Sequence, residues 1–183
     1  KIESKIDKKN KNIVFLESEV CFSKNLKSKF SKAQVESDIG KLPRESNIII
    51  ANEFFDAIPV NQYVYNKNNW YEKLVSLDKN NNFQFIISKK NKTSNTFFPK
   101  NPKENQVFEF SEYIINLLTF ICANIRKYGG IFLIIDYAKT DTDCYGTLSV
   151  INKHKYVKPF FKLGESDISF KPDFNLIAEV AKE

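Results

Sequence analysis

The stretch Ile48-Ile49-Ile50-Ala51-Asn52-Glu53 predicts a buried strand that ends on a polar pair. Two other apolar runs end in the same way: residues 13–16 precede Glu17, and residues 131–135 precede Asp136. Short, unbroken, β-branched runs are typical of strands covered on both faces, as in a parallel sheet. Ligands of open parallel sheets bind beyond the carboxyl ends of the strands. The pattern therefore predicts three acids at one ligand-binding edge; the alternative is that the strands simply exit into polar loops.

Size and composition predict one globular domain over residues 1–183. Hydrophobic residues make up 42% of the chain, and 17 phenylalanines are enough to bury a core. No apolar run approaches the roughly 20 residues that a membrane span requires. The three cysteines, Cys21, Cys122 and Cys144, show no C-x-x-C spacing, which favours a reducing compartment and argues against a zinc site. We therefore expect no metal, no membrane span, and a location in bacterial cytoplasm or an organelle matrix.

The net charge of +6 comes almost entirely from lysine. The chain has 26 lysines, only two arginines and 20 asparagines. Nucleic-acid surfaces usually rely on the planar guanidinium group for paired contacts to bases and phosphates. Diffuse lysine charge gives only weak, salt-sensitive attraction to a polyanion. We therefore expect no nucleic-acid partner.

The order of elements predicts an α/β fold with an antiparallel insertion. Residues 62–88 contain three strand-like runs separated by Asn/Lys clusters, which is typical of a meander. Residues 89–106 are rich in lysine, asparagine and proline and predict a long loop. Residues 1–12 predict a solvated segment. The chain starts with Lys1, contains no methionine and carries a helical pattern to its last residue, so we expect it to be incomplete at both ends.

Two helices have clear start signals. Ser111 can cap a helix whose apolar stripe recurs at helical spacing and ends at Gly129, which is a common stop residue. The stripe consists of Ile114, Leu118, Ile121, Ile125 and Tyr128. Asp173 can cap a second helix near the end of the chain.

Residues 51–59, A-N-E-F-F-D-A-I-P, resemble the MidA-like family of S-adenosylmethionine-dependent methyltransferases. Further matches follow in order: Gln62 with Val64, Trp70-Tyr71-Glu72-Lys73, Glu109, Gly129-Gly130, Ile135-Asp136-Tyr137, Gly146-Thr147-Leu148, His154, Asp167-Ile168-Ser169 and Asp173-Phe174. The resemblance implies a class I methyltransferase: a Rossmann-like, mostly parallel sheet with helices on both faces. The family includes bacterial proteins and a mitochondrial respiratory complex I assembly factor associated with protein arginine methylation. A protein substrate and a bacterial cytoplasmic or mitochondrial matrix location follow from it.

The sequence departs from the family at its glycine-rich cofactor loop. None of the five glycines forms G-x-G, the pattern that lets the backbone approach the cofactor. The resemblance also places the missing strand in the middle of the sheet. S-adenosylmethionine binding therefore depends on an upstream segment or a second chain that completes the sheet. The alternative is a noncatalytic remnant or interaction module of the same fold.

The resemblance assigns cofactor contacts to four positions. Glu17 ends the family's second strand, where a carboxylate can accept both ribose hydroxyls. Asp38 and Ile39 follow the third strand, near the adenine. Asn52 ends the fourth strand and serves both the cofactor and the reaction.

The catalytic candidates are Glu53, Asp56 and Asn52. If the acceptor is a guanidinium, carboxylates can hold it through paired, charge-assisted hydrogen bonds and stabilise the charge that develops. The alternative for Asp56 is that it caps the turn that follows the strand. Asp136, Tyr137 and His154 are the candidates for the substrate side. As the only histidine, His154 can titrate near neutral pH, but a solitary histidine is also commonly structural.

Overall fold

The computed structural model describes residues 14–16, 24, 28, 34–36, 39–92, 96–140 and 142–182. The chain divides into two compact units, residues 1–46 and residues 47–183. In the first unit β1 (Val14–Leu16) pairs in parallel with β2 (Gln34–Glu36). A short 3-10 helix, η2 (Ile39–Lys41), follows. The predicted solvated segment and the acids Glu17 and Asp38 lie outside the described residues.

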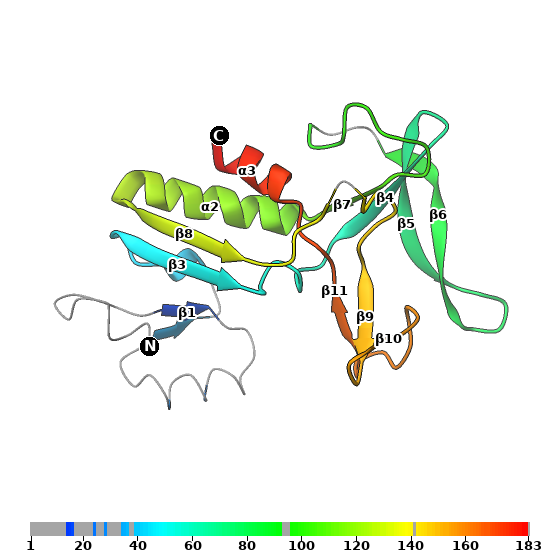
Figure 1. Ribbon diagram of the computed structural model, residues 1–183, viewed down its shortest axis with the longest axis horizontal. Helices are drawn as coiled ribbons and strands as arrows, with labels where there is room; N and C mark the ends of the chain where they lie inside the picture. Colours follow the sequence, from blue (N-terminus) through cyan, green and yellow to red (C-terminus); the bar gives the residue numbers. More distant parts are fainter. Residues whose placement is uncertain are drawn as a thin grey trace. The chain divides into compact units, whose positions relative to one another are not determined.

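The second unit contains the parallel strand pair that the apolar runs predict (Figure 1). β3 (Asn47–Asn52) pairs with β8 (Gly130–Ile135), and the register joins Asn47 to Gly130 and Asn52 to Ile135. Gly130 is required where the strands meet, because a Cβ there would lie 2.2 Å from the Asn47 carbonyl oxygen. The two strands therefore end at the same edge. Just beyond their ends, Phe55 and Asp136 are joined by a hydrogen bond although they lie 81 residues apart in the sequence.

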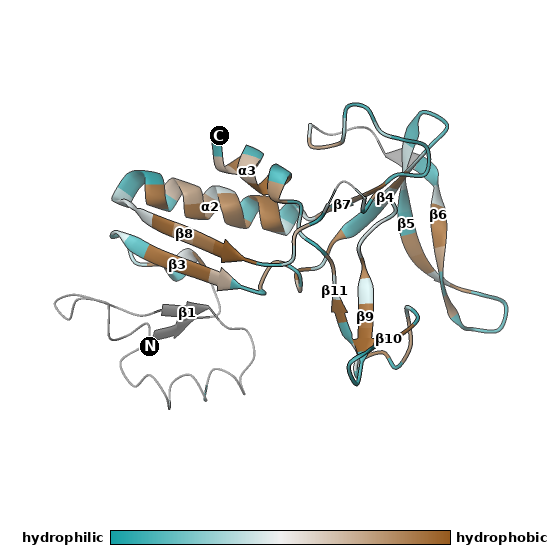
Figure 2. Ribbon diagram, viewed as in Figure 1, coloured by the Kyte–Doolittle hydropathy of each residue, from teal (hydrophilic) through white to brown (hydrophobic). Residues whose placement is uncertain are grey.

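Helix α2 (Glu112–Tyr128) packs against β8 and confirms the predicted capping. The Ile114 amide donates to Ser111 Oγ at 3.4 Å, and Gly129 ends the helix with φ +84°. β8 is apolar over most of its length, and β3 is apolar in its middle and polar at both ends (Figure 2). Their alternate residues differ in burial: Ala51 is 9% exposed, whereas Ile48 and Ile131 are 68% and 63% exposed. In the described residues, therefore, one face of the parallel pair is covered and the other is open.

The predicted antiparallel meander is confirmed. β4 (Asn61–Asn66), β5 (Asn69–Leu77), β6 (Phe83–Lys92) and β7 (Val107–Phe110) form a four-stranded sheet in the order β6-β5-β4-β7. β6 continues four residues into the region predicted as a loop, because Asn91 and Lys92 still pair with β5 beyond a shift in register. One face of this sheet carries an aromatic core of Tyr63, Trp70, Phe98 and Phe108.

A small third sheet and a second helix complete the unit. β9 (Ser149–Asn152) lies between β10 (Lys155–Tyr156) and β11 (Asp167–Ser169), and both pairings are antiparallel. Helix α3 (Phe174–Lys182) packs on α2. The amides of Asn175 and Leu176 donate to Asp173 Oδ1 at 3.0 and 3.2 Å, so Asp173 caps the helix as predicted.

The described residues thus form an α/β structure with mixed sheets. The parallel pairings are β1 with β2 and β3 with β8, while the other two sheets are antiparallel. This differs from the expectation of a mostly parallel sheet with helices on both faces. The difference arises because residues 61–110 and 149–169 pair among themselves and do not join β3 and β8. Across the described ranges, no helix is long and apolar enough to cross a membrane.

Candidate active site

The carboxyl ends of β3 and β8 bring the predicted site residues Asn52, Glu53 and Asp136 to one edge. Asn52 pairs with Ile135, so Glu53 and Asp136 follow side by side at the two strand ends. The Glu53 amide extends the pairing by donating to the Ile135 carbonyl at 2.8 Å. Asn52 and Glu53 are exposed. The parallel register, and not the sequence spacing, is what places these acids together.

Asp136 holds the turn that follows β3. Its Oδ2 accepts the amide of Phe55 at 2.9 Å and the amide of Asp56 at 3.2 Å. Its Oδ1 accepts the amide of Tyr137 at 2.8 Å. A carboxylate satisfied by three amides fixes the backbone around it. Asp136 therefore holds this turn, and a capping role for Asp56 stays a prediction.

The backbone at Glu53 adopts an unusual conformation. Its φ is +46°, in the left-handed region that non-glycine residues seldom occupy. Such residues cost about 1–3 kcal/mol and tend to cluster at functional sites. The Ile135 carbonyl accepts the amide of Glu53 itself, and the Asp136 carboxylate accepts the amide of Phe55, two residues later. The local structure thus keeps Glu53 at the strand end despite the cost.

Asp56 is the electrostatically perturbed member of the group. Partial burial raises the pKa of its carboxyl, and the neighbouring charges of Asp136 and Glu53 raise it further. The Ala57 amide opposes the shift by hydrogen bonding, and Asp167 on β11 adds a smaller increase. Asp56 Oδ1 is buried and has no hydrogen-bond partner among the described residues. The site therefore concentrates negative charge around a carboxylate oxygen that lacks a donor.

The two phenylalanines beside these acids form the wall of the turn. Phe55 is fully buried and lies 6.2 Å from Phe132 of β8 between ring centroids. Phe54 meets the edge of Phe55 at 5.6 Å. Their packing fixes the turn from its apolar side, as the Asp136 bonds fix it from the polar side.

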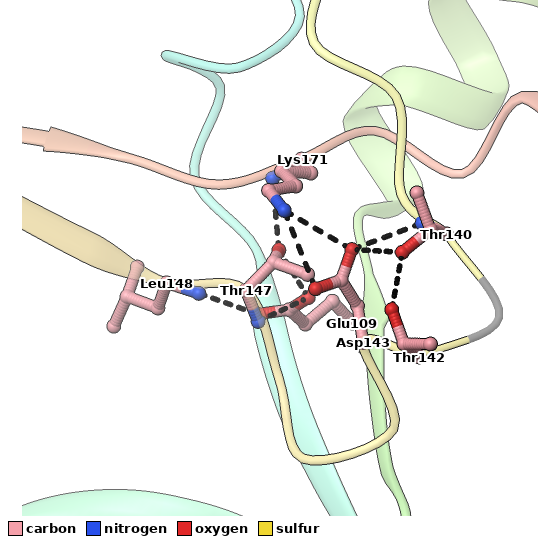
Figure 3. A network of polar contacts seen from close by, with 7 residues as sticks. All are labelled: Glu109, Thr140, Thr142, Asp143, Thr147, Leu148 and Lys171. Carbon is pink, nitrogen blue, oxygen red and sulfur yellow. Dashed lines mark hydrogen bonds and ion pairs between the residues drawn. The ribbon is translucent and has the colours of Figure 1, made fainter.

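A second carboxylate, Glu109 of β7, anchors the loop that follows Asp136 (Figure 3). It is 6% exposed and accepts the Gln62 side-chain amide at 2.8 Å. It also accepts the Thr147 amide and hydroxyl, at 3.0 and 2.7 Å, and the Leu148 amide at 3.1 Å. Every one of these donors comes from another segment of the chain. Glu109 thus ties the meander to the 146–148 segment.

The same network continues to the segment after β11 (Figure 3). The Lys171 amide donates to Thr147 Oγ1 at 2.8 Å, and Lys171 Nζ pairs with Asp143 Oδ2 at 3.1 Å. Asp143 also accepts the Thr140 amide and hydroxyl, which together with Lys171 lower the pKa of its carboxyl. This network holds Thr140 and residues 143–148 downstream of Asp136.

The remaining predicted residues lie elsewhere. Tyr137 is adjacent to Asp136 and is 61% exposed, so its side chain is open to a ligand. His154 lies in the exposed turn between β9 and β10, which belongs to a different sheet from β3 and β8. Ile39 opens η2 in the first unit. The roles predicted for these residues stay predictions.

Sequence reasoning gave no role to the Glu109 network, although Glu109 and residues 146–148 carry part of the family resemblance. One signal was present: Glu109 interrupts the strand Val107-Phe108-Glu109-Phe110, where a charge among buried residues requires partners. The partners could not be found from the sequence, since Gln62, Thr147 and Leu148 are 38 to 47 residues away.

Comparisons with known proteins place this geometry among methyltransferases. The model of a family described as "Putative S-adenosyl-L-methionine-dependent methyltransferase" matches residues 7–183. The chain is 26% identical over 151 residues to a protein arginine methyltransferase NDUFAF7 homolog, mitochondrial, of Drosophila melanogaster, covering 77% of this chain and 33% of the fly protein. It is 28% identical over 148 residues to the mitochondrial NDUFAF7 protein arginine methyltransferase of Danio rerio, covering 78% and 34%. The chain thus spans about a third of these relatives.

Two solved structures share the fold. Both are proteins of one superfamily from Burkholderia thailandensis. The first, in its native form, has a TM-score of 0.70 at 21% identity, with 93% of this chain and 49% of that chain covered. The second is bound to S-adenosyl-homocysteine and has a TM-score of 0.67 at 20% identity, with 93% and 47% covered. At this level of identity the likeness concerns the fold.

Proposed function

This chain belongs to a family of S-adenosyl-L-methionine-dependent methyltransferases, and from that premise we propose that it supplies the acceptor side of a methyltransferase active site. The reaction is transfer of a methyl group to a nitrogen of a protein arginine side chain. One observation carries the proposal. Asp56 presents a buried, unpartnered carboxylate oxygen beside Glu53 and Asp136, an arrangement that a cationic ligand would stabilise.

Glu53 and Asp56 would hold the guanidinium. Two carboxylates near a planar cation can form charge-assisted hydrogen bonds that fix its orientation. In-line displacement depends on such positioning, because the attacking nitrogen must point at the methyl carbon. The raised pKa of Asp56 also suits its carboxylate to accept the proton that the nitrogen releases. Asn52 offers an amide at the same strand end for cofactor or acceptor.

The chemistry of the edge fits the cofactor as well as the acceptor. Acidic and amide oxygens suit hydroxyl groups and a positive charge, and the orphaned oxygen of Asp56 lacks such a partner. When bound, S-adenosylmethionine supplies the electrophilic methyl group. Glu17 stays our proposal for the ribose hydroxyls, and Asp38 with Ile39 for the adenine end. Asp136, Tyr137 and His154 stay our proposal for the substrate side.

The glycine loop has to come from outside this sequence. None of the five glycines forms G-x-G, so we propose that an upstream segment or a second chain supplies the loop and the strand before it. The completed assembly would then have the class I arrangement, a mostly parallel sheet with helices on both faces. The open apolar face formed by residues such as Ile48 and Ile131 is consistent with a missing layer.

The printed names of the relatives guide the acceptor and the location. The fly and zebrafish proteins are named as mitochondrial protein arginine methyltransferases, and this chain spans about a third of each. We propose a protein arginine as acceptor and the mitochondrial matrix as location. A link to respiratory complex I assembly remains part of this proposal.

A second candidate function is a noncatalytic interaction module of the same fold. The observation that favours it is the lack of a glycine loop in this sequence. In that case the acidic edge, formed by Glu53, Asp56 and Asp136, would be a remnant. The scaffold held by Glu109 would then be the part that binds a partner.

Titration of S-adenosylmethionine distinguishes the two functions. We expect no appreciable binding by this chain alone and micromolar-range binding, on the order of 8 kcal/mol, once the chain is extended by its upstream coding sequence. In the extended form Glu53→Gln should slow methyl transfer to an arginine peptide and leave cofactor affinity unchanged. Failure of the extended form to bind would favour the module. Equal binding by both forms would disprove the dependence on an outside loop, and unchanged turnover would remove Glu53 from the reaction.

A further inference from the structure

We infer that residues 153–164, here termed the basic tip, are a docking surface for an anionic lipid bilayer. The segment comprises the β9–β10 turn, β10 and the first part of the connection to β11. It lies outside the acidic edge, and the inference does not rest on methyl transfer. Its support is a concentration of positive charge and of exposed apolar side chains on one ordered segment.

The charge of the basic tip differs from that of the rest of the chain. Its four lysines, Lys153, Lys155, Lys158 and Lys162, are all exposed, and the segment contains no aspartate or glutamate. Elsewhere 24 basic residues face 22 acids, so two-thirds of the net charge of +6 comes from these twelve positions. Within the part of the chain that the structure describes, one ion pair involves the tip: Lys162 meets Glu165 at 3.4 Å, with both side chains exposed. Such a pair contributes little and leaves the local excess in place.

Large apolar side chains accompany the lysines. Tyr156 is 80% exposed, Phe161 45% and Leu163 50%. Exposed apolar groups gathered on one segment typically mark an interaction surface. Aromatic and aliphatic side chains interleaved with lysine are the composition of segments that lie in a membrane interface. The tip therefore offers both terms of peripheral binding, charge attraction and shallow insertion.

The basic tip is held in a defined conformation. The Asn152 side-chain amide donates to the Glu165 carbonyl at 2.9 Å, and Ser166 Oγ donates to the Phe161 carbonyl at 2.8 Å. The Phe160 ring packs against Phe85 of β6, with 4.7 Å between centroids. These contacts join the two ends of the segment and fix it to the meander, so its exposed side chains are presented by a scaffold and not by a loose loop.

Four residues of the tip adopt the left-handed backbone conformation of turns. Phe160 has φ +70° and Lys162 has φ +45°, although bulky side chains disfavour the left-handed region. Lys153 and His154 also have positive φ, as a tight hairpin turn requires. The turn geometry accounts for the second pair. The first pair lies in the turns closed by the Phe161 amide on the Lys158 carbonyl and by the Glu165 amide on the Lys162 carbonyl, which hold this stretch of backbone in a defined bend.

Charge selects the bilayer over a second copy of this chain. Two basic tips would repel each other in a symmetric dimer, since the same four lysines would face themselves. Anionic lipid headgroups attract each nearby lysine by about 1 kcal/mol, which is roughly fivefold in affinity. Exposed tyrosine and phenylalanine side chains then add apolar contacts with the membrane interface, and a diffuse polyanion does not offer such contacts.

The test is flotation of this chain with two kinds of vesicle. We expect binding to phosphatidylcholine vesicles that contain about one third phosphatidylserine, and no binding to phosphatidylcholine alone. The double variant K155E/K158E should lower the partition coefficient by at least about tenfold. The matched control K100E/K103E changes the same charge at exposed lysines of another segment and should lower it by less than about threefold.

A second variant tests insertion. Y156S/F161S keeps the charge and should weaken binding severalfold, most visibly at high salt, where charge attraction is screened. Absence of binding to anionic vesicles, or equal losses in the two lysine doubles, would overturn the inference. Unchanged binding by Y156S/F161S, together with equal affinity for single-stranded RNA, would assign the tip to a polyanion. Loss of self-association in K155E/K158E without vesicle binding would make it an interface between copies. Circular dichroism checks that each variant folds.

Discussion

Glu109 and Asp56 are both acids inside the same compact unit, and their surroundings are opposite. Glu109 is buried and receives donors from Gln62, Thr147 and Leu148. Asp56 is partly buried, faces the like charges of Asp136 and Glu53, and keeps one oxygen unpartnered. A buried carboxylate whose hydrogen bonds are all made stabilises the fold. An unsatisfied carboxylate in an acidic cluster instead gains favourable interactions when a cationic ligand binds. The contrast separates the scaffold of this fold from its candidate site.

The largest expected effect is the loss of Glu109. Glu109→Ala would leave the buried Gln62 donor and the partly buried Thr147 donors without this acceptor, and we expect the free energy of unfolding to fall by about 3 kcal/mol. Urea denaturation monitored by circular dichroism measures this. Glu104→Ala is the control, because Glu104 is exposed and accepts a single amide, from Lys67, at 3.3 Å. A loss below about 1 kcal/mol for Glu109→Ala would end the view of Glu109 as the anchor.

Replacing Asp136 tests how the two regions are linked. Asp136→Ala removes the acceptor of the Phe55 and Asp56 amides, and we expect a loss of about 2 kcal/mol by the same denaturation measurement. Asp136→Asn keeps an acceptor oxygen and removes the charge, so it should cost less and bring the pKa of Asp56 closer to its ordinary value. Similar losses in both variants would show that the charge of Asp136, and not its hydrogen bonds, holds the turn.

The scaffold and the site differed in how far the sequence could predict them. The strand runs, the meander and the caps at Ser111 and Asp173 follow from local patterns, because propensity and capping act within a few residues. The edge formed by Glu53 and Asp136 was predictable from a general rule about parallel strands, since both acids follow buried runs. Which acid holds the turn and which is left unpartnered depends on register and orientation across 81 residues, and local patterns carry no information on that.

The fold class was harder for the same reason. Apolar runs identify strands but do not say which strands pair, and β3 and β8 form the parallel pair of this unit while neighbouring segments build antiparallel sheets. The roles of Gln62 and Thr147 were equally hidden, because each is an ordinary polar residue until a buried acid from another strand meets it. Long-range pairing, and not local preference, decided these features.

The smallest expected effect is also the sharpest test of the contrast. The folded chain holds a proton on Asp56 more tightly than the unfolded chain does, since burial and the charges of Asp136 and Glu53 raise its pKa above 3.8. The unfolded state then binds fewer protons, so this group lowers the free energy of unfolding as pH rises from about 4 through the native pKa. Asp56→Asn removes that penalty and should raise the free energy of unfolding slightly at neutral pH, because solvent screens this partly exposed group, with no gain below pH of about 4.

Asp143→Asn is the matched control, because its carboxyl has the opposite shift: Thr140 and Lys171 lower its pKa, so its contribution is present above 3.8 and lost as pH falls. Its replacement should therefore destabilise the chain at neutral pH and have no effect in strong acid. Urea titrations at several pH values compare both variants with the parent. If Asp56→Asn destabilised the chain at neutral pH, Asp56 would be a satisfied structural acid like Glu109. We expect Asp56→Asn to gain stability at neutral pH and to lose methyl transfer in the extended form. That combination is typical of a residue that serves function at the expense of stability.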